Sequence, residues 1–176
     1  MIIKPDNEML SYSGRIDFDD RLPPDLVYAC SSIGMKFTGT SLKAVIVNHR
    51  SCWTNELGYF IDGEQKRFTL SSDEEKKTYT LAENLPEGTH ELLLFKRMDS
   101  CHTFTFYGFE IDDGAKVLAL PEKPKRKMEF FGDSVSCGEV SEAVEYAGKP
   151  DPEHDGQYSN SWYSYAWIAA RKLDAQ

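Results

Sequence analysis

Between residues 14 and 120 the chain consists of short apolar runs, each followed by glycine, serine, asparagine or aspartate. The runs are rich in β-branched and aromatic residues, and runs of this length broken by turn residues are typical of β-strands. We expect strands over residues 26–30, 34–37, 42–48, 58–61, 65–70, 78–81, 90–97 and 102–111. The pattern therefore predicts about eight or nine strands, and no convincing helix in this part of the chain.

The clearest turn in this stretch is Asp62-Gly63, between the runs at 58–61 and 65–70. Aspartate followed by glycine suits the two positive-φ positions of a type I′ turn, so we expect a hairpin here. The runs at 90–97 and 102–111 carry apolar residues on both faces, which is typical of central strands. Together these features predict a mostly β fold, an antiparallel jelly-roll β-sandwich.

The pattern changes after residue 120. Residues 121–127 hold two prolines and a basic cluster in an otherwise acidic chain, which favours a solvated linker over a binding patch. We therefore expect a sandwich domain over 1–120, a linker over 121–127 and a second unit over 128–176.

The second unit has the pattern of an α/β domain at its beginning. Residues 128–138 predict a short buried strand, a serine turn and the start of a helix, and residues 145–160 form a polar loop. Asn160 is expected to cap a helix running to about Leu173, with one apolar face made of Trp162, Ala166, Ala169 and Leu173. One strand and one helix cannot close a parallel sheet. The unit must pack on the sandwich, or be completed by a missing C-terminal segment or a second chain.

Ser134 lies at the predicted break between strand and helix, in Gly132-Asp133-Ser134. Such a break can hold a serine hydroxyl clear of the backbone for nucleophilic attack, and the Ser134 N–H could serve as one oxyanion donor. The motif is not Gly-x-Ser-x-Gly, because position 136 is serine. Gly132 and Asp133 would shape the turn. The local sequence fits equally a tight turn that caps a helix, with no catalytic role for the serine.

Composition narrows the possible partners. The net charge is −9 and the pI is near 4.9, which argues against nucleic acid as a partner. The four histidines lack metal-ligand spacing and Cys-x-x-Cys is absent, so we expect no metal and no cofactor. The four dispersed cysteines are expected to be free thiols.

No apolar run approaches the ~20 residues of a membrane helix, so no membrane partner is expected. As written the chain predicts a cytoplasmic protein, or a secreted one if an export signal has been removed.

Several segments, taken in order along nearly the whole chain, resemble carbohydrate esterase family 2. Segments similar to its N-terminal jelly roll are Gly14-Arg15, Phe37-Thr38-Gly39-Thr40-Ser41-Leu42, Ile61-Asp62-Gly63-Glu64, Tyr79-Thr80-Leu81-Ala82, Pro86-Glu87-Gly88-Thr89-His90, Lys96-Arg97 and Gly108-Phe109. Residues 126–134 resemble the entry to the SGNH-hydrolase domain that follows in that family. Ser164-Tyr165-Ala166 and Ala170-Arg171 resemble its first long helix.

This resemblance implies a serine esterase that removes O-acetyl groups from xylan-type and related saccharides, with Ser134 as the nucleophile. SGNH enzymes take further oxyanion donors from a later glycine and a later Gly-x-Asn-Asp, and their base from a late Asp-x-x-His. None of those late segments occurs here, so the resemblance implies an N-terminal portion that is inactive alone. Asp151-Pro152-Glu153-His154 does spell Asp-x-x-His, but it lies in a loop rich in proline and glycine. His154 is thus either a base or a surface loop histidine.

Two main functional hypotheses follow, besides a third possibility, an interaction scaffold whose incomplete α/β unit is completed by another polypeptide. The first is a carbohydrate O-acetyl esterase whose partner is an acetylated oligo- or polysaccharide. The alternative is a non-catalytic carbohydrate-binding β-sandwich module. Trp53, in the loop Ser51-Cys52-Trp53, is a candidate for a surface contact with a sugar or for a loop anchor.

Overall fold

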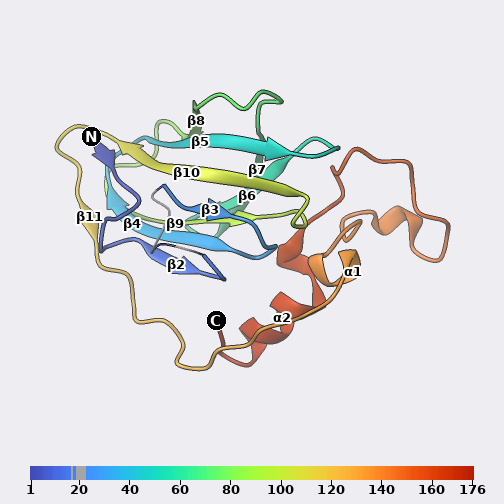
Figure 1. Cartoon of the computed structure of the whole chain (residues 1–176). Helices are drawn as coiled ribbons and strands as arrows, with labels where there is room; N and C mark the ends of the chain where they lie inside the picture. The colour runs from blue at the N-terminus through green and yellow to red at the C-terminus, as the bar shows by residue number, and fades with distance from the viewer. Residues whose placement is uncertain (17, 19–22) are drawn as a thin grey trace.

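The computed structural model describes residues 1–16, 18 and 23–176. Its strands form two sheets in which every strand pair is antiparallel (Figure 1). The five-stranded sheet contains β1 (Ile2–Ile3), β10 (His102–Ile111), β5 (Leu42–Arg50) and β8 (Lys77–Ala82) in that order, and β3 (Asp25–Leu26) also pairs with β10. The six-stranded sheet contains β11 (Val117–Leu118), β4 (Ser32–Thr38), β9 (Thr89–Lys96), β6 (Glu56–Ile61) and β7 (Glu64–Thr69), and β2 (Ser11–Ser13) pairs with β4.

Successive strands cross between the two sheets, which gives the jelly-roll connectivity. The chain passes from β4 to β5 in the other sheet, returns for the β6–β7 hairpin, crosses to β8, and crosses twice more through β9 and β10. β9 lies between β4 and β6, and β10 lies between β1 and β5, so both strands are central as predicted. The predicted antiparallel β-sandwich is confirmed.

One apolar core lies between the sheets. Alternating side chains of β4 and β9 meet those of β5 and β10, and the largest contributors are fully or almost fully buried: Ile33, Met35, Phe37, Leu92, Leu94, Leu42, Ala44, Ile46, Phe104, Phe106 and Phe109. Burial of large apolar side chains on both sheets is the main stabilising contribution to such a fold. This core holds β9 and β10 in place, together with the loop that joins them.

The predicted hairpin at Asp62-Gly63 is confirmed. Ile61 pairs with Glu64, and the two residues between them have φ values of 52° and 84°.

The predicted strand over 26–30 is largely wrong, because β3 ends at Leu26. Residues 28–31 instead form a turn, closed by a hydrogen bond from Ser31 N to Tyr28 O, in which Cys30 has a φ of 67°. A left-handed residue cannot continue a strand.

The strand predicted directly before Ser134 does not form. Residues 127–133 pair with no strand, and Phe131 is 82% exposed rather than buried. Their neighbour is the C-terminal end, through one parallel bridge from Arg126 to Ala175 and a hydrogen bond from Met128 N to Gln176 O. An extended segment becomes a sheet strand only when neighbouring strands satisfy its backbone groups, and none flanks this one in the described residues.

The rest of the C-terminal segment is short helices joined by loops: α1 (Ser134–Cys137), η1 (Val144–Tyr146), η2 (Ser161–Tyr163) and α2 (Tyr165–Lys172). The single helix predicted from Asn160 is broken, because Ser164 has a ψ of 145° and caps α2 through Trp167 N, while Asn160 caps η2. Trp162 therefore does not share a helical face with Ala166. The buried positions of α2 are Ala166 and Ala170, and Leu173 is exposed.

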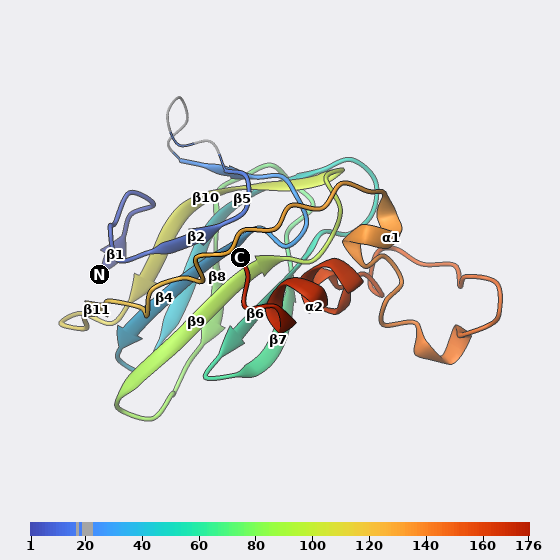
Figure 2. The same ribbon diagram turned by 90° about the horizontal axis from the view of Figure 1, so that it is seen from below.

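This segment packs on the outer face of the six-stranded sheet, with α2 lying over β6 and β9 (Figure 2). The ring of Trp162 lies 4.4 Å from that of Phe60 and 4.8 Å from that of Trp167, and Trp167 packs edge-on against Phe95 at 5.4 Å. The guanidinium of Arg171 stacks over Trp162 at 3.7 Å. Of the arrangements left open by the sequence, packing on the sandwich is thus observed. No helix in the described residues is both long and apolar enough to cross a membrane.

Candidate active site

Ser134 is the first residue of α1 and is exposed. The Asp133 carboxylate caps this helix by accepting a hydrogen bond from Val135 N at 3.2 Å. Ser134 Oγ makes no hydrogen bond to any described residue. The hydroxyl is therefore accessible, and no base from the described part of the chain is in contact with it.

Gly132 allows a close approach of the turn to α1. A Cβ at position 132 would lie 2.0 Å from Ser136 Oγ and 2.7 Å from Ser136 Cβ. Rotating the serine hydroxyl would relieve the first contact but not the second. Ser136 Oγ in turn shares a 2.8 Å hydrogen bond with Tyr165 OH, which ties α1 to α2. Glycine at 132 is thus required sterically for this arrangement.

The far end of α1 is anchored to the sandwich through η2. Gly138, with a φ of 78°, ends the helix, and its carbonyl accepts a hydrogen bond from Asn160 N at 3.0 Å. The next residue, Ser161, bonds to the end of β9: its N–H donates to Arg97 O at 3.0 Å and its hydroxyl donates to Lys96 O at 2.7 Å. The serine turn is therefore positioned by the sandwich core rather than by its own short helix.

An ion pair made by a buried arginine reinforces this junction. Arg97 is 2% exposed and donates from Nη2 to Glu142 Oε2 at 2.8 Å. The other oxygen of Glu142 accepts from Asn160 Nδ2 at 2.7 Å. Two further charged side chains lie close by. Glu56 Oε2 is 3.9 Å from Arg97 Nε, and Arg67 Nη1 is 3.7 Å from Glu142 Oε2. A charge this deeply buried is tolerated only when it is paired, so Glu142 and Arg97 depend on each other.

Lys96, directly before Arg97, is fully buried as well. Its ammonium donates to Met98 O at 2.7 Å and to Asp99 O, and burial lowers its pKa from 10.5 to about 7. Nothing in the sequence marks Lys96 or Arg97 as buried. They appear in the sequence as an ordinary basic pair after an apolar run. The Lys96 ammonium is enclosed at the β9–β10 turn, whereas Arg97 pairs with Glu142 of the C-terminal segment.

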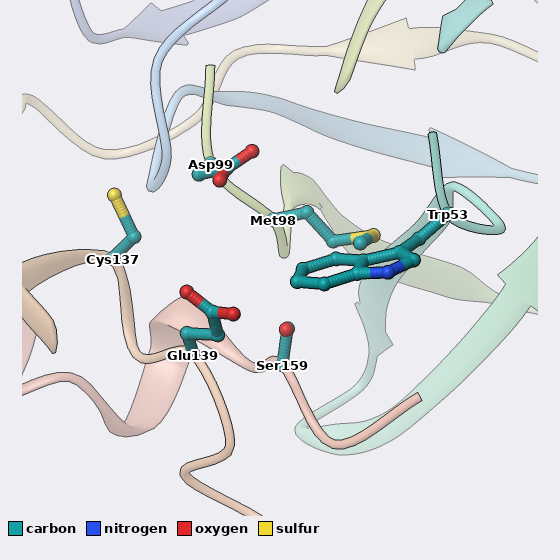
Figure 3. A pocket seen from close by; sticks show the side chains of 6 residues that line it. All are labelled: Trp53, Met98, Asp99, Cys137, Glu139 and Ser159. Carbon is teal, nitrogen blue, oxygen red and sulfur yellow. The ribbon is translucent and has the colours of Figure 1, made fainter. Parts of the chain in front are cut away.

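A small hollow lies where α1, the loop after β5 and the turn between β9 and β10 meet. Figure 3 shows the six side chains that line it: Trp53, Met98, Asp99, Cys137, Glu139 and Ser159. The Trp53 ring packs against His154 at 4.5 Å and is parallel to His102 at 6.2 Å. This packing is that of a loop anchor, one of the two roles expected for Trp53.

His154 lies on the Trp53 side of this hollow. Its Nδ1 accepts a hydrogen bond from Gly156 N at 3.2 Å, and its Nε2 is 3.8 Å from Glu139 Oε1. The structure records no contact between His154 and Ser134, so these two predicted site residues are not brought together. Nδ1 is thus the acceptor nitrogen of the His154 ring, and it is already engaged by the backbone N–H of Gly156 in the same loop. No cluster of three or more metal-ligating side chains occurs in the described residues.

Known proteins resemble this chain in sequence and in structure. A family model described as "Carbohydrate esterase 2 N-terminal" matches residues 12–121. The chain is 33% identical over 171 residues to "Cellulase/esterase CelE" of Acetivibrio thermocellus, covering 97% of this chain and 20% of that protein. It is 26% identical over 153 residues to an "Acetylxylan esterase / glucomannan deacetylase" of Cellvibrio japonicus, covering 83% of this chain and 41% of that protein.

Among solved structures, a family two carbohydrate esterase from Clostridium thermocellum in complex with cellohexaose superposes with a TM-score of 0.82 at 31% identity. The match covers 95% of this chain and 49% of that one, so the chain spans about half the length of the solved relative. Because the family model covers most of the chain and the likeness extends into the C-terminal segment, the protein belongs to carbohydrate esterase family 2.

Proposed function

We propose that this chain is the N-terminal portion of a serine carbohydrate O-acetyl esterase, with Ser134 as the nucleophile. The observation that carries the proposal is the exposed Ser134 hydroxyl on a turn built by Gly132 and Asp133, in a member of carbohydrate esterase family 2. Its substrates would be acetylated xylan-type or related saccharides. The acetylxylan esterase among the relatives and the solved complex with cellohexaose support this substrate class.

In this mechanism Ser134 Oγ attacks the acetyl carbonyl, and the Ser134 N–H is one donor to the developing oxyanion. The base that takes the serine proton and the remaining oxyanion donors would come from segments beyond residues 1–176. Two observations support this division: Ser134 Oγ has no hydrogen-bond partner in the described residues, and the solved relative is about twice as long. Base, nucleophile and donors act as a unit, so residues 1–176 alone are expected to be nearly inactive.

The test is acetate release from p-nitrophenyl acetate and from acetylated xylo-oligosaccharide. It compares residues 1–176 with a longer form that carries a complete hydrolase domain. Ser134→Ala should abolish turnover by the longer form, whereas the control Ser136→Ala keeps the nucleophile and loses one hydrogen bond to Tyr165. Full activity of Ser134→Ala would reject its role. Robust turnover by residues 1–176 would reject the division of the site, and would direct attention back to His154.

The second candidate function is a non-catalytic carbohydrate-binding module. A family 35 carbohydrate-binding module superposes on 69% of this chain with a TM-score of 0.53, and at 14% identity this likeness concerns the fold alone. Calorimetric titration of residues 1–176 with xylo- and cello-oligosaccharides separates the two proposals. Tight binding that Ser134→Ala leaves unchanged, with no turnover by the longer form, would favour the binding module.

A further inference from the structure

Cys52, His102 and Asp99 form a chain of contacts that the esterase mechanism does not use. Cys52 Sγ lies 3.8 Å from His102 Nε2, within reach of a sulfur hydrogen bond, and His102 Nδ1 lies 3.1 Å from Asp99 Oδ1. A nucleophile next to a base that is itself oriented by a third group is the arrangement that activates cysteine thiols. Cys52 and His102 are 50 residues apart in sequence, so only the fold reveals this arrangement.

The β5–β10 ladder brings Cys52 beside His102. His102 is the first residue of β10 and pairs with Arg50 at the end of β5, which places the residues after Arg50 beside the His102 ring. His102 is fully buried, whereas Cys52 is exposed, so the base lies beneath a thiol that solvent can reach. Asp99 is held in turn by a 3.0 Å hydrogen bond from Cys101 N to its Oδ1.

The hydrogen-bond roles are consistent with proton transfer from sulfur to imidazole. A carboxylate can only accept, so Asp99 fixes the His102 proton on Nδ1 and leaves Nε2 free to accept the thiol proton. The hydroxyl of Ser51 also donates to Cys52 Sγ, at 3.6 Å, and would stabilise negative charge on sulfur. The guanidinium of Arg50 donates to Cys52 O at 2.6 Å and adds a nearby positive charge.

None of the other three cysteines has a histidine partner in the described residues, although the Lys96 amine lies near all three. Burial raises the pKa of Cys30 to about 11, against opposing hydrogen bonds from Ser161 and Ser164, and burial also raises the pKa of Cys137. Both thiols therefore stay protonated and shielded at neutral pH. Cys101 is exposed like Cys52, but its sulfur makes no hydrogen bond to a described residue. It is the exposed comparison thiol, and because the Lys96 ammonium near it favours a thiolate, the comparison with Cys52 is a stringent one.

We propose that Cys52 is a thiol-modification site, at which His102 as general base and Asp99 as positioning residue promote attack on small-molecule disulfides. In this step Cys52 Sγ forms a bond to one sulfur of the reagent while the S–S bond of the reagent breaks. The proton taken up by His102 passes to the leaving thiolate. The products are a mixed disulfide on Cys52 and one free small thiol, so no further oxidant is needed.

The test measures reaction with the chromogenic disulfide dithiodipyridine at neutral pH, and peptide mass mapping locates the adduct. Cys101→Ser leaves Cys52 as the exposed thiol, and Cys52→Ser leaves Cys101. The Cys101→Ser protein, which reacts through Cys52, should react about tenfold faster or more than the Cys52→Ser protein, which reacts through Cys101. The reason is that an unassisted thiol is only a few per cent ionised at this pH. Equal rates for the two variants, or a faster reaction at Cys101, would overturn the proposal.

The dependence on His102 and Asp99 is tested in the Cys101→Ser background. His102→Gln and Asp99→Asn should each lower the rate at neutral pH, and Asp99→Glu should restore part of it. At alkaline pH the thiol ionises without a base, so the variants should converge on the parent rate. The charged groups around this cluster are Arg50 beside Cys52, Asp155 near His102 and Lys96 beside Asp99, and all three are unchanged in all variants. Because His102 is buried, the rate of His102→Gln is interpreted only if circular dichroism shows a native fold. Whether or not that variant folds, an unchanged rate in Asp99→Asn would refute the assisted mechanism.

Discussion

Loss of the Glu142 carboxylate should destabilise the junction between the sandwich and the C-terminal segment. In Glu142→Gln the nearest remaining anion to Arg97 is Glu56, 3.9 Å from its Nε, and the guanidinium stays 2% exposed. Breaking a fully buried ion pair costs about 3–5 kcal/mol. The Glu142 side chain is 30% exposed, so water compensates part of this and we expect about 2 kcal/mol.

Thermal unfolding followed by circular dichroism measures this effect. For a chain of this size 2 kcal/mol corresponds to a decrease in Tm of about 4–8 °C. The matched control is Glu129→Gln, which removes the ion pair with Arg15, where the side chains are 63% and 55% exposed. That pair should contribute less than about 1 kcal/mol.

A second variant separates the charge effect from a general loss of packing. Arg97→Met combined with Glu142→Leu removes both charges together, and apolar replacements of a buried pair are often neutral. The double variant should therefore be more stable than Glu142→Gln. If Glu142→Gln and Glu129→Gln lower the Tm equally, Glu142 does not compensate a buried charge and the reasoning fails.

Two further predictions concern Gly132 and Lys96. Gly132→Ala should displace α1, because the new Cβ would lie 2.7 Å from Ser136 Cβ. The esterase activity of the longer form should therefore fall. Adding Ser136→Gly removes the contact and should restore part of the activity. Unchanged activity in the single variant would contradict the steric argument. Lys96 has a pKa of about 7 when folded and 10.5 when unfolded, so above pH 7 the unfolded chain binds more protons and stability rises with pH. The Tm of the unsubstituted chain should therefore increase relative to that of Lys96→Met as pH is raised through 7. If the difference between the two Tm values does not change with pH, the pKa of Lys96 in the folded state is not lowered.

The sequence by itself determined the features that depend on neighbouring residues. Asp62-Gly63 dictates its hairpin because few residue pairs accept two positive φ angles, and the apolar runs dictate most of the strands because one or both of their faces must be buried. The turn at Ser134 belongs to the same class. Asp133 caps the helix that follows it, and this contact spans only two residues.

Only the tertiary structure decided what depends on distant partners. Residues 128–131 have the apolar pattern of a strand, yet they form none without flanking strands to accept their backbone hydrogen bonds. Buried Arg97 pairs with Glu142 of the C-terminal segment, and the Lys96 ammonium is buried against the carbonyls of the β9–β10 turn. Cys52 meets His102 because β5 and β10 are paired in one register. Local sequence patterns carry propensities, whereas burial and long-range contacts depend on which segments pack together, and that is a property of the whole fold.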